Sequence, residues 1–404
     1  MGLFRMAWRN IGRNRRRTGV TVAAMTLALF VMVVYTGLMQ GMLGDMERSI
    51  LETEIGDLQV HSEGYLDDPS IYAVIEEPYA LIEELEGAGF RATPRLVGGA
   101  LVAARESSAG ASLRGIDVAR DQTVSDIHTR VAAGEWLDPS EPRGVVVGRR
   151  LARSLDITVG DELIALSQAS DGSMANDLFM VRGILGPISD VTDRTGVFMP
   201  AETFREFFVL ERGVHQIVVR RPSDVDLESA FVELMKLTPG LDTRSWRQLL
   251  PTLATMLDSA QIALQMVSFI VYIVIAILIL NAMLMAVFER IREFGLLKAL
   301  GVGPGRVMAL IFTESCMQTG LALAIGLTLS APTLWYLSNR GIDLGSFAGT
   351  SMLGLSMAAV WKAAVSPATF AGPVFTLVAI VLVAVVYPAV KAARISPVEA
   401  MRHQ

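Results

Sequence analysis

The hydrophobic residues of this 404-residue chain gather in four long runs, at roughly 20–41, 262–288, 307–329 and 370–390. A helix needs about 20 mostly apolar residues to cross the hydrocarbon core of a bilayer. The pattern therefore predicts a polytopic α-helical membrane protein with four transmembrane helices, which we place at 19–42, 261–288, 307–330 and 370–391.

The long segment between the first two runs has the mixed pattern of a globular domain. Short β-rich stretches, such as 55–62, 144–148, 161–167, 178–186 and 214–221, alternate with helical stretches at 78–89 and 225–240. We expect a large α+β extracytoplasmic domain at 43–260, inserted between the first and second transmembrane helices. Residues 331–369 are expected to form a loop on the same side of the membrane.

Charge is distributed very unevenly, and this sets the predicted orientation. Residues 1–18 carry six Arg and no acidic residue, in an amphipathic spacing that predicts a basic helix lying on the membrane surface. Together with the 289–306 loop and the tail from Lys391 onward, they hold 13 basic and 3 acidic residues, whereas residues 45–258 hold 20 basic and 36 acidic ones. Basic segments stay on the cytoplasmic side, so both termini, including the 392–404 tail, are predicted to be cytoplasmic.

The basic start also fits a cleaved signal peptide. However, the first apolar run is longer than a signal peptide requires and no small-residue cleavage site follows it, so we expect a retained anchor.

The chain lacks the usual signatures of catalysis. None of its four lysines follows a glycine, which excludes the common phosphate-binding loop. The four histidines are scattered, and no G-x-S-x-G nucleophile motif is present. We therefore expect no enzyme activity, no metal and no cofactor in this chain, and no nucleic-acid partner. The single cysteine, Cys316, excludes an intrachain disulfide.

Glu314 lies inside the third apolar run, where an ionised side chain is costly unless it is paired or functional. It could be a functional ionisable group. It could also lie near the cytoplasmic headgroups and pack against an arginine or the backbone.

The 289–306 loop reads as a short charged helix followed by a turn. Phe294, Leu297 and Leu300 form an apolar stripe, and the glycines from Gly301 onward end the helix. Such a helix suits the docking of a soluble partner, and it equally suits a solvated connector.

The loop resembles the cytoplasmic loop of the FtsX/MacB/LolC–LolE superfamily of ABC transporter permeases, whose pattern is E-R-x-x-E-x-G-x-x-x-A-x-G. The matching residues are Glu289, Arg290, Glu293, Gly295, Ala299 and Gly301, while Phe294 replaces the more usual aliphatic residue. The stretches 7–18, 145–166, 179–185 and 387–402 are also similar to the family, so that the resemblance covers nearly the whole chain.

This resemblance implies the permease subunit of an ABC transporter in the bacterial inner membrane. A cytoplasmic ABC ATPase dimer would bind ATP and Mg²⁺, and a second permease copy or a paralogue would complete the complex. ATP hydrolysis would drive extracytoplasmic work by mechanotransmission. The implied coupling residues are Glu289, Arg290, Glu293, Phe294, Gly295, Leu297, Lys298, Ala299 and Gly301.

The stretches 151–163 and 341–347 are most similar to the lipoprotein-releasing branch, which implies lipoprotein extraction from the inner membrane and transfer to a periplasmic carrier or adaptor. MacB-like efflux of macrolides or peptides is an alternative, as is FtsX-like regulation of a cell-wall hydrolase, whose outer domain is usually smaller. We expect a substrate cavity for a lipoprotein or another hydrophobic substrate. Its candidate lining residues are Met32, Tyr35, Met39, Met266, Phe269 and Ile270.

Overall fold

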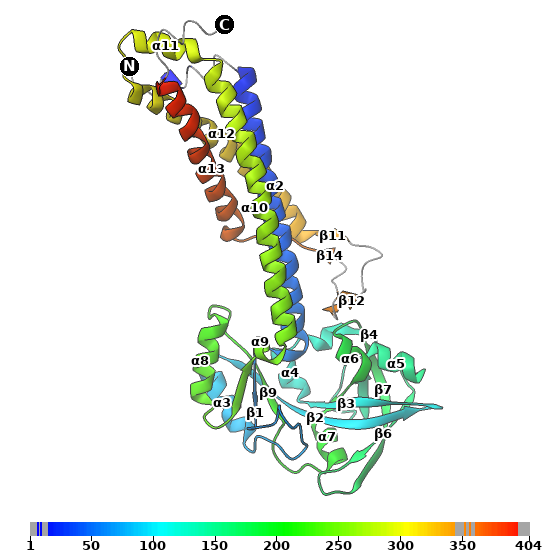
Figure 1. Ribbon diagram of the computed structural model, residues 1–404. Coiled ribbons are helices and arrows are strands. Elements are labelled where there is room, and N and C mark those ends of the chain that lie inside the picture. The colour runs from blue at the N-terminus through cyan, green and yellow to red at the C-terminus, as the bar shows by residue number, and fades with distance from the viewer. Residues whose placement is uncertain are drawn as a thin grey trace. The chain divides into compact units, whose positions relative to one another are not determined.

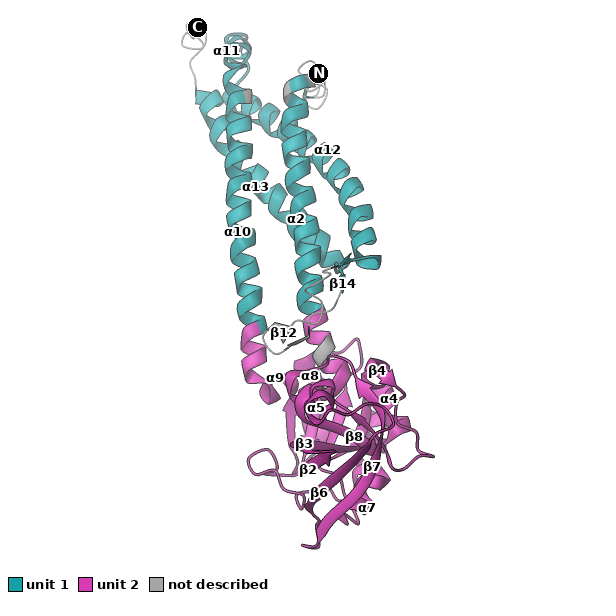
Figure 2. Ribbon diagram, turned by 90° about the vertical axis from the view of Figure 1, so that its right-hand side faces the viewer, with its two compact units in different colours: residues 1–44, 257–344, 360–404 teal, residues 45–256, 345–359 magenta. Residues whose placement is uncertain are grey.

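The computed structural model describes Met6, Ala7, Arg9 and residues 15–343, 351–352, 355–356 and 360–394. Two compact units are present: one holds residues 1–44, 257–344 and 360–404, and the other holds residues 45–256 and 345–359 (Figure 2). Of the predicted amphipathic helix at 1–18, only Met6, Ala7, Arg9 and residues 15–18, which begin a long helix, are described. Nearly all of the 392–404 tail lies outside the described residues.

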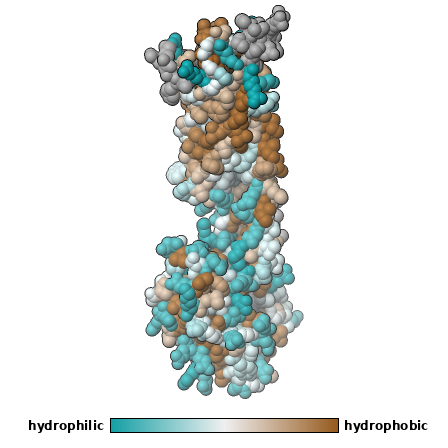
Figure 3. Space-filling model, turned by 60° about the vertical axis from the view of Figure 1, so that its left-hand side comes forward, coloured by the Kyte–Doolittle hydropathy of each residue, from teal (hydrophilic) through white to brown (hydrophobic). Residues whose placement is uncertain are grey.

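The first unit is a bundle of four long helices that lie side by side (Figure 1). They are α2 (Arg15–Ile50), α10 (Pro251–Phe288), α12 (Pro304–Asn339) and α13 (Pro367–Arg394), and the short α11 (Ile291–Ala299) connects α10 to α12. All four long helices are long and apolar enough to cross a membrane, which confirms the predicted number. Hydrophobic side chains cover much of this unit's surface, as expected of a surface that contacts lipid (Figure 3).

The helices extend beyond the predicted spans. The first continues to Ile50 instead of ending at 42, the second begins at Pro251 instead of 261, and the third continues to Asn339 instead of 330. Hydropathy marks the part of a helix that can contact lipid, whereas capping and packing decide where the helix ends.

The segment 331–369 therefore begins as helix and not as loop. Its described remainder contains two small antiparallel ladders, β11 (Ile342–Asp343) with β14 (Val360–Trp361) and β12 (Ser351–Met352) with β13 (Leu355–Ser356).

The core of the bundle is apolar and involves the four helices unequally. Met25, Leu29 and Val33 of α2 are fully or almost fully buried, as are Val385 and Ala389 of α13. The buried residues of α10 in this core begin only at Ile275. From Leu257 to Val274, a stretch that the structure describes in full, no residue is buried. Val271 and Tyr272 of this stretch are partly buried against the core.

The second unit is built on a ten-stranded sheet with strand order β10-β1-β9-β2-β3-β8-β5-β7-β4, in which β6 pairs with both β2 and β7. The strands are β1 (Leu58–His61), β2 (Arg91–Ala104), β3 (Ser107–Ile116), β4 (Val131–Gly134), β5 (Gly144–Val147), β6 (Glu162–Gln168), β7 (Met174–Leu185), β8 (Gly196–Pro200), β9 (Gln216–Arg220) and β10 (Asp242–Ser245). The helices are η1 (Leu51–Ile55), α3 (Pro78–Gly87), α4 (Val118–Val124), η2 (Ile127–Arg130), α5 (Arg149–Leu155), α6 (Asp190–Thr195), α7 (Ala201–Phe208), α8 (Leu227–Leu237) and α9 (Trp246–Leu249).

Because β6 joins β2 to β7, the strands β2, β3, β8, β5, β7 and β6 pair in a closed ring. The strands β9, β1 and β10 continue from the N-terminal half of β2, on the same edge as β6, and β4 pairs with β7. Closure protects the ring strands from unwanted pairing with other chains. The predicted α+β domain is confirmed, and each strand and helix predicted in it is present.

Two strand glycines allow α7 to pack closely on β2 and β3. A β-carbon on Gly98 would lie 2.6 Å from the ring of Phe208, and one on Gly115 would lie 2.5 Å from the side chain of Phe204. Both phenylalanines are buried, and their rings are 4.5 Å apart. The aromatic face of α7 therefore takes the space that larger side chains on the strands would fill.

Two buried histidines lie close together in this domain. His61 of β1 and His215, next to β9, flank Tyr65, with ring centroids 5.3 and 5.9 Å from its ring. The Nδ1 atom of His215 accepts a hydrogen bond from the backbone N–H of Val97. Burial lowers the pKa of His61 to about 4, and it also lowers the pKa of His215.

We expect the chain to lose stability on acidification, because a histidine buried in its neutral form takes up a proton more readily once the chain unfolds. His61 should contribute stability fully above pH 6.5 and lose it as the pH falls toward 4, with a loss of about 2 kcal/mol between pH 7 and pH 5. Thermal melts of the full chain in nanodiscs should show a shallower pH dependence for His61→Phe. An unchanged dependence in that variant would contradict the assignment.

Candidate functional site

The loop between α10 and α12 contains the short helix α11, with a turn on each side of it. After Phe288 the chain makes a tight turn, α11 begins at Ile291, and Gly301 ends the helix with a positive φ of 87°. The Val302 N–H donates to the Leu297 carbonyl across this end. Pro304 then starts α12 in the first turn, a position at which a missing N–H is harmless.

The exposed face of α11 is not the face predicted from its apolar stripe. Phe294 is buried and Leu297 half-buried, because both pack against the core of the helix bundle. Leu300 is 75% exposed, and Leu296, on the outer face, is 60% exposed. The stripe of Phe294, Leu297 and Leu300 is therefore not one free surface, and the exposed apolar pair of this segment is Leu296 and Leu300.

Arg290 connects this loop to the third long helix. Its Nη1 atom lies 2.6 Å from Oε2 of Glu314, and its Nε atom lies 2.9 Å from Oε2 of Glu293. The Arg290 and Glu314 side chains are both less than a tenth exposed. Burial acts against the charge of Arg290, but the Glu314 and Glu293 carboxylates outweigh it and raise its pKa.

Glu314 thus has an arginine partner. The ion pair links the residue before α11 to α12.

Two lysines connect the same region to the fourth helix. Lys298 Nζ donates a 2.7 Å hydrogen bond to the Ala393 carbonyl of α13. Lys391 Nζ of α13 lies 4.5 Å from the ring centroid of Phe288, at the end of α10. The loop is therefore fixed to α10, α12 and α13. Glu289, Glu293, Gly295, Ala299 and Gly301 lie in or beside this turn as predicted, and their contact with a partner stays a prediction.

A cavity of about 390 Å³ lies between α2, α10 and α13, near the ends of α2 and α10 that lead to the domain. Three of the six predicted lining residues, Tyr35, Met39 and Phe269, contribute to it. The other three do not line it: Met32 is buried in the bundle core, and Met266 and Ile270 are exposed elsewhere on α10.

The residues that line this cavity include more polar side chains than the apolar runs of the sequence predicted. Its hydrogen-bonding side chains are all neutral: Tyr35, Thr36, Gln40, Gln261, Gln265, Ser268, Tyr272 and Thr376. No charged side chain occurs among the lining residues, so a charged ligand would find no counter-ion there. The cavity suits an uncharged molecule that combines amide, ester or hydroxyl groups with apolar parts. Three glutamines, Gln40, Gln261 and Gln265, lie within or beside apolar runs of the sequence and could have indicated this polar wall.

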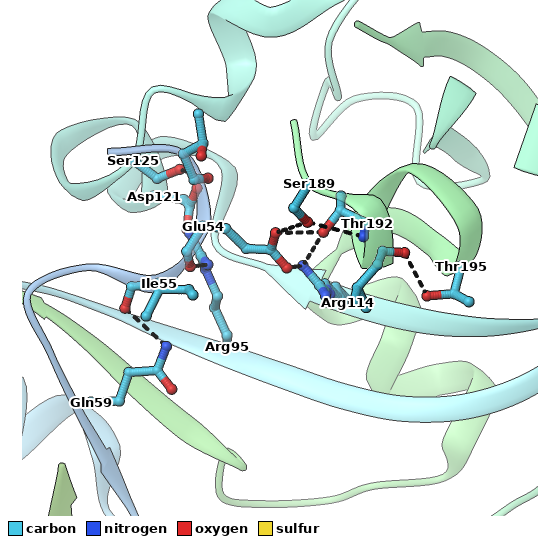
Figure 4. A network of polar contacts seen from close by, with 12 residues as sticks. Glu54, Ile55, Gln59, Arg95, Arg114, Asp121, Ser125, Ser189, Thr192 and Thr195 are labelled. Atoms are coloured by element: carbon cyan, nitrogen blue, oxygen red, sulfur yellow. Dashed lines mark hydrogen bonds and ion pairs between the residues drawn. The ribbon is translucent and has the colours of Figure 1, made fainter. Parts of the chain in front are cut away.

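A second polar site lies directly after α2, within the domain unit (Figure 4). The carboxylate of Glu54, in η1, bonds with Arg114 of β3 and Thr192 of α6, and the Ser189 hydroxyl lies 3.3 Å from its Oε2 atom. The backbone carbonyl of Glu54 accepts from Arg95 of β2. Arg95 is in turn paired with buried Asp121 of α4 at 2.8 Å.

The strand that follows η1 pairs with the strand that precedes α9 and α10. Leu58 of β1 lies opposite Ser245 of β10, and the Trp246 N–H donates to the Asp57 carbonyl at 3.1 Å. The two long helices are therefore joined to neighbouring strands of the domain. Sequence reasoning missed Glu54 because one glutamate among 36 acidic residues of this segment carries no distinguishing pattern.

In the part of the chain that the structure describes, no three His, Cys, Asp or Glu side chains gather in a way that could hold a metal ion.

Four long apolar helices, a large domain between the first two and a bonded helix in the loop between the next two are the arrangement expected of an ABC transporter permease. The family comparisons agree: the MacB-like periplasmic core domain matches residues 18–237, and the FtsX-like permease C-terminal region matches residues 265–397. The chain belongs to the FtsX/MacB superfamily and is a multi-pass membrane protein.

Curated relatives are distant. The macrolide export ATP-binding/permease protein MacB 1 of Yersinia pestis bv. Antiqua (strain Antiqua) is 25% identical over 358 residues, which cover 82% of this chain and 52% of the relative. An uncharacterized ABC transporter permease of Methanocaldococcus jannaschii is 26% identical over 208 residues, covering 49% of this chain and 50% of the relative. The chain thus spans about half the length of these relatives.

Among solved structures, the periplasmic region of MacB from Actinobacillus actinomycetemcomitans is similar with a TM-score of 0.38 and 14% identity, covering 51% of this chain and 95% of that one. The extracellular domain of the ABC-type transporter YknZ from Gram-positive bacteria gives 0.34 and 15%, covering 46% of this chain and 98% of that one.

We predict that breaking the buried ion pair destabilises the chain. Arg290→Met removes the arginine partner of Glu314 and should destabilise the purified chain by about 3 kcal/mol. Glu314→Leu should cost less, because Arg290 keeps its contact with Glu293, and the double variant should be less destabilised than the sum of the two. Thermal unfolding in nanodiscs measures this. Arg48→Met, at an exposed pair 3.6 Å from Asp45, is the control and should change stability by less than about 1 kcal/mol. A double variant as unstable as the sum of the singles would refute the coupling.

Proposed function

We propose that this chain is the permease subunit of a transporter in which a separate cytoplasmic ATPase dimer binds ATP and Mg²⁺ and this chain transmits the resulting motion. The observation that supports the proposal is the set of contacts that fix the loop around α11. Arg290 bonds to Glu314 of α12, and Lys298 bonds to the Ala393 carbonyl of α13. A push on α11 would move α12 and α13 with it, since the Arg290 contact is buried and the Lys298 contact is partly buried. The chain itself would hydrolyse no ATP.

The charge distribution supports the proposed orientation, and the family resemblance supports a bacterial inner membrane. The basic segments at both ends and at 289–306 would face the cytoplasm of a bacterium, and the acidic domain would lie outside the inner membrane. A second copy of the chain, or a paralogue, would complete the permease.

The proposed work is the extraction of lipoproteins from the membrane. An acyl-anchored protein is already in lipid and needs no aqueous crossing to reach a cavity among membrane helices. Its amide- and ester-bearing anchor is an uncharged mixed ligand, which matches the neutral wall formed by Gln40, Gln261 and Gln265. Each buried methylene holds such an anchor by about 0.8 kcal/mol, so extraction requires ATP-driven work or a receiving carrier.

Efflux of macrolides or peptides is the second candidate, and the names of the Yersinia relatives favour it. A protonated amine on such a substrate would find no carboxylate among the residues that line the cavity. The two candidates therefore differ in the ligand found at the cavity wall.

The first prediction concerns docking of the ATPase. Leu296→Asp combined with Leu300→Asp should abolish co-purification of an ATP-binding subunit and its ATP hydrolysis, because an unpaired carboxylate cannot be buried cheaply in an apolar contact. Both leucines are exposed, so the chain itself should stay folded. Val191→Asp, at an exposed valine of the domain, is the matched control. Retention of the ATPase by the double variant would show that this pair is not the docking surface.

The second prediction concerns the substrate. Photocrosslinking amino acids at Tyr35 and Phe269 should capture lipoproteins in cells, while the same probe at Phe375, an exposed position of α13 outside the cavity, should not. Crosslinks that macrolides abolish, with normal lipoprotein localisation on depletion of the chain, would favour efflux. Crosslinks only to the other helices of the chain would reject both substrates for this cavity.

A further inference from the structure

A short non-helical segment, residues 360–364, crosses α2 beside the cavity, and we call it the strap. The indole N–H of Trp361 donates a 2.8 Å hydrogen bond to the Leu38 carbonyl of α2. The backbone N–H of Ala364 donates, also at 2.8 Å, to the Gly37 carbonyl. These carbonyls lie inside a helix, so each accepts from the strap in addition to its helical partner.

Two glycines of α2 make this crossing sterically feasible. A β-carbon on Gly41 would lie 2.0 Å from the Lys362 carbonyl oxygen and 2.8 Å from the Ala364 nitrogen, both of them backbone atoms that cannot swing aside. A β-carbon on Gly37 would lie 2.4 Å from the Leu334 side chain. The Gly37-x-x-x-Gly41 spacing, which often brings two helices together, here receives a non-helical segment.

The strap also contacts the third and fourth helices. The Ala363 N–H donates to the Leu337 carbonyl of α12 at 3.3 Å. Two residues into α13, the buried Thr369 hydroxyl donates a 2.9 Å hydrogen bond to the Gln40 side chain of α2. At this end of the bundle, α2 is therefore bonded to α12 and α13 through one small cluster.

The second helix is held differently at the same level. Between Leu257 and Val274, all of which the structure describes, α10 has no buried residue, although Val271 and Tyr272 pack partly against the bundle core and Tyr272 hydrogen-bonds Thr376 of α13. This half supplies Gln261, Gln265 and Phe269 to the cavity wall, opposite Tyr35 and Met39 of α2. The strap contacts described above involve α2, α12 and α13, and none of them involves α10.

We propose that Gly41 and Trp361 are positioning residues, and that the strap joins α2, α12 and α13 into one body relative to which α10 moves to open and close the cavity. This inference rests on the proposed function for its transport consequence. The strap itself is a property of the chain alone, which allows the two to be tested separately.

The first experiment uses the full chain alone in nanodiscs, with Cys316 replaced by serine and spin labels at Val31 of α2 and Phe375 of α13, both exposed. Gly41→Ala should broaden the measured distance distribution. Gly44→Ala is the matched control, because a β-carbon there meets nothing within 4 Å. Trp361→Phe, which removes only the N–H donor and some ring surface, should broaden it as well, and Trp335→Phe, at an exposed tryptophan of α12, should not. Distributions unchanged by Gly41→Ala and Trp361→Phe would overturn the strap.

The second experiment adds the ATPase subunit and compares the nucleotide-free complex with the vanadate-trapped one. Labels at Met266 of α10 and Phe375 should shift, and labels at Val31 and Phe375 should not. Equal shifts in both pairs would refute α10 as the moving wall. If no label pair moves although the strap variants broaden the first distribution, the strap stands and the proposed transport mechanism fails.

Discussion

Inside a membrane the backbone has no water to bond with, and this constraint governs the helical unit of the chain. It requires four long helices in which backbone groups satisfy one another, and it restricts how any other segment can enter. Residues 360–364, which are not helical, donate from the Ala364 backbone and the Trp361 indole to carbonyls of α2. The buried charges obey the same rule, since Arg290 and Glu314 occur together. Polar groups in this unit thus join elements that hydrophobic packing alone would leave free to slide.

Two carboxylates bond to arginines from other elements. Glu314, which is buried, bonds to Arg290 before α11, and Glu54, which is partly buried in η1, bonds to Arg114 of β3 and Thr192 of α6. Separating the Arg290–Glu314 pair would break a buried ion pair, which is costly, so this contact resists opening more strongly than an apolar contact of the same size.

The sequence predicted the number and order of the helices because uninterrupted apolar runs are unambiguous, but hydropathy could not show that α12 continues through Pro332 to Asn339. In the domain, β1, β5, β6, β7 and β9 were recognisable from their β-branched residues. The strands β2 and β3 were missed because Gly98, Gly115 and many alanines hide a strand whose partners are the aromatic side chains of α7. The motif located α11, yet a stripe of apolar residues cannot say whether Phe294 faces a partner or its own bundle. Glu54 needed the fold, since its arginine lies 60 residues away.

The crossing of the strap over α2 limits how the sequences of the two segments can change in evolution. Gly41 and the backbone of Lys362–Ala364 occupy one shared space, although they lie more than 300 positions apart in the chain. A larger side chain at position 41 is compatible only with a strap that follows another path, so the two segments must change together or stay as they are. A chimera that takes its first helix from one relative and its last two helices from another would separate them. Such a junction would fail at this contact, even where every helix inserted correctly.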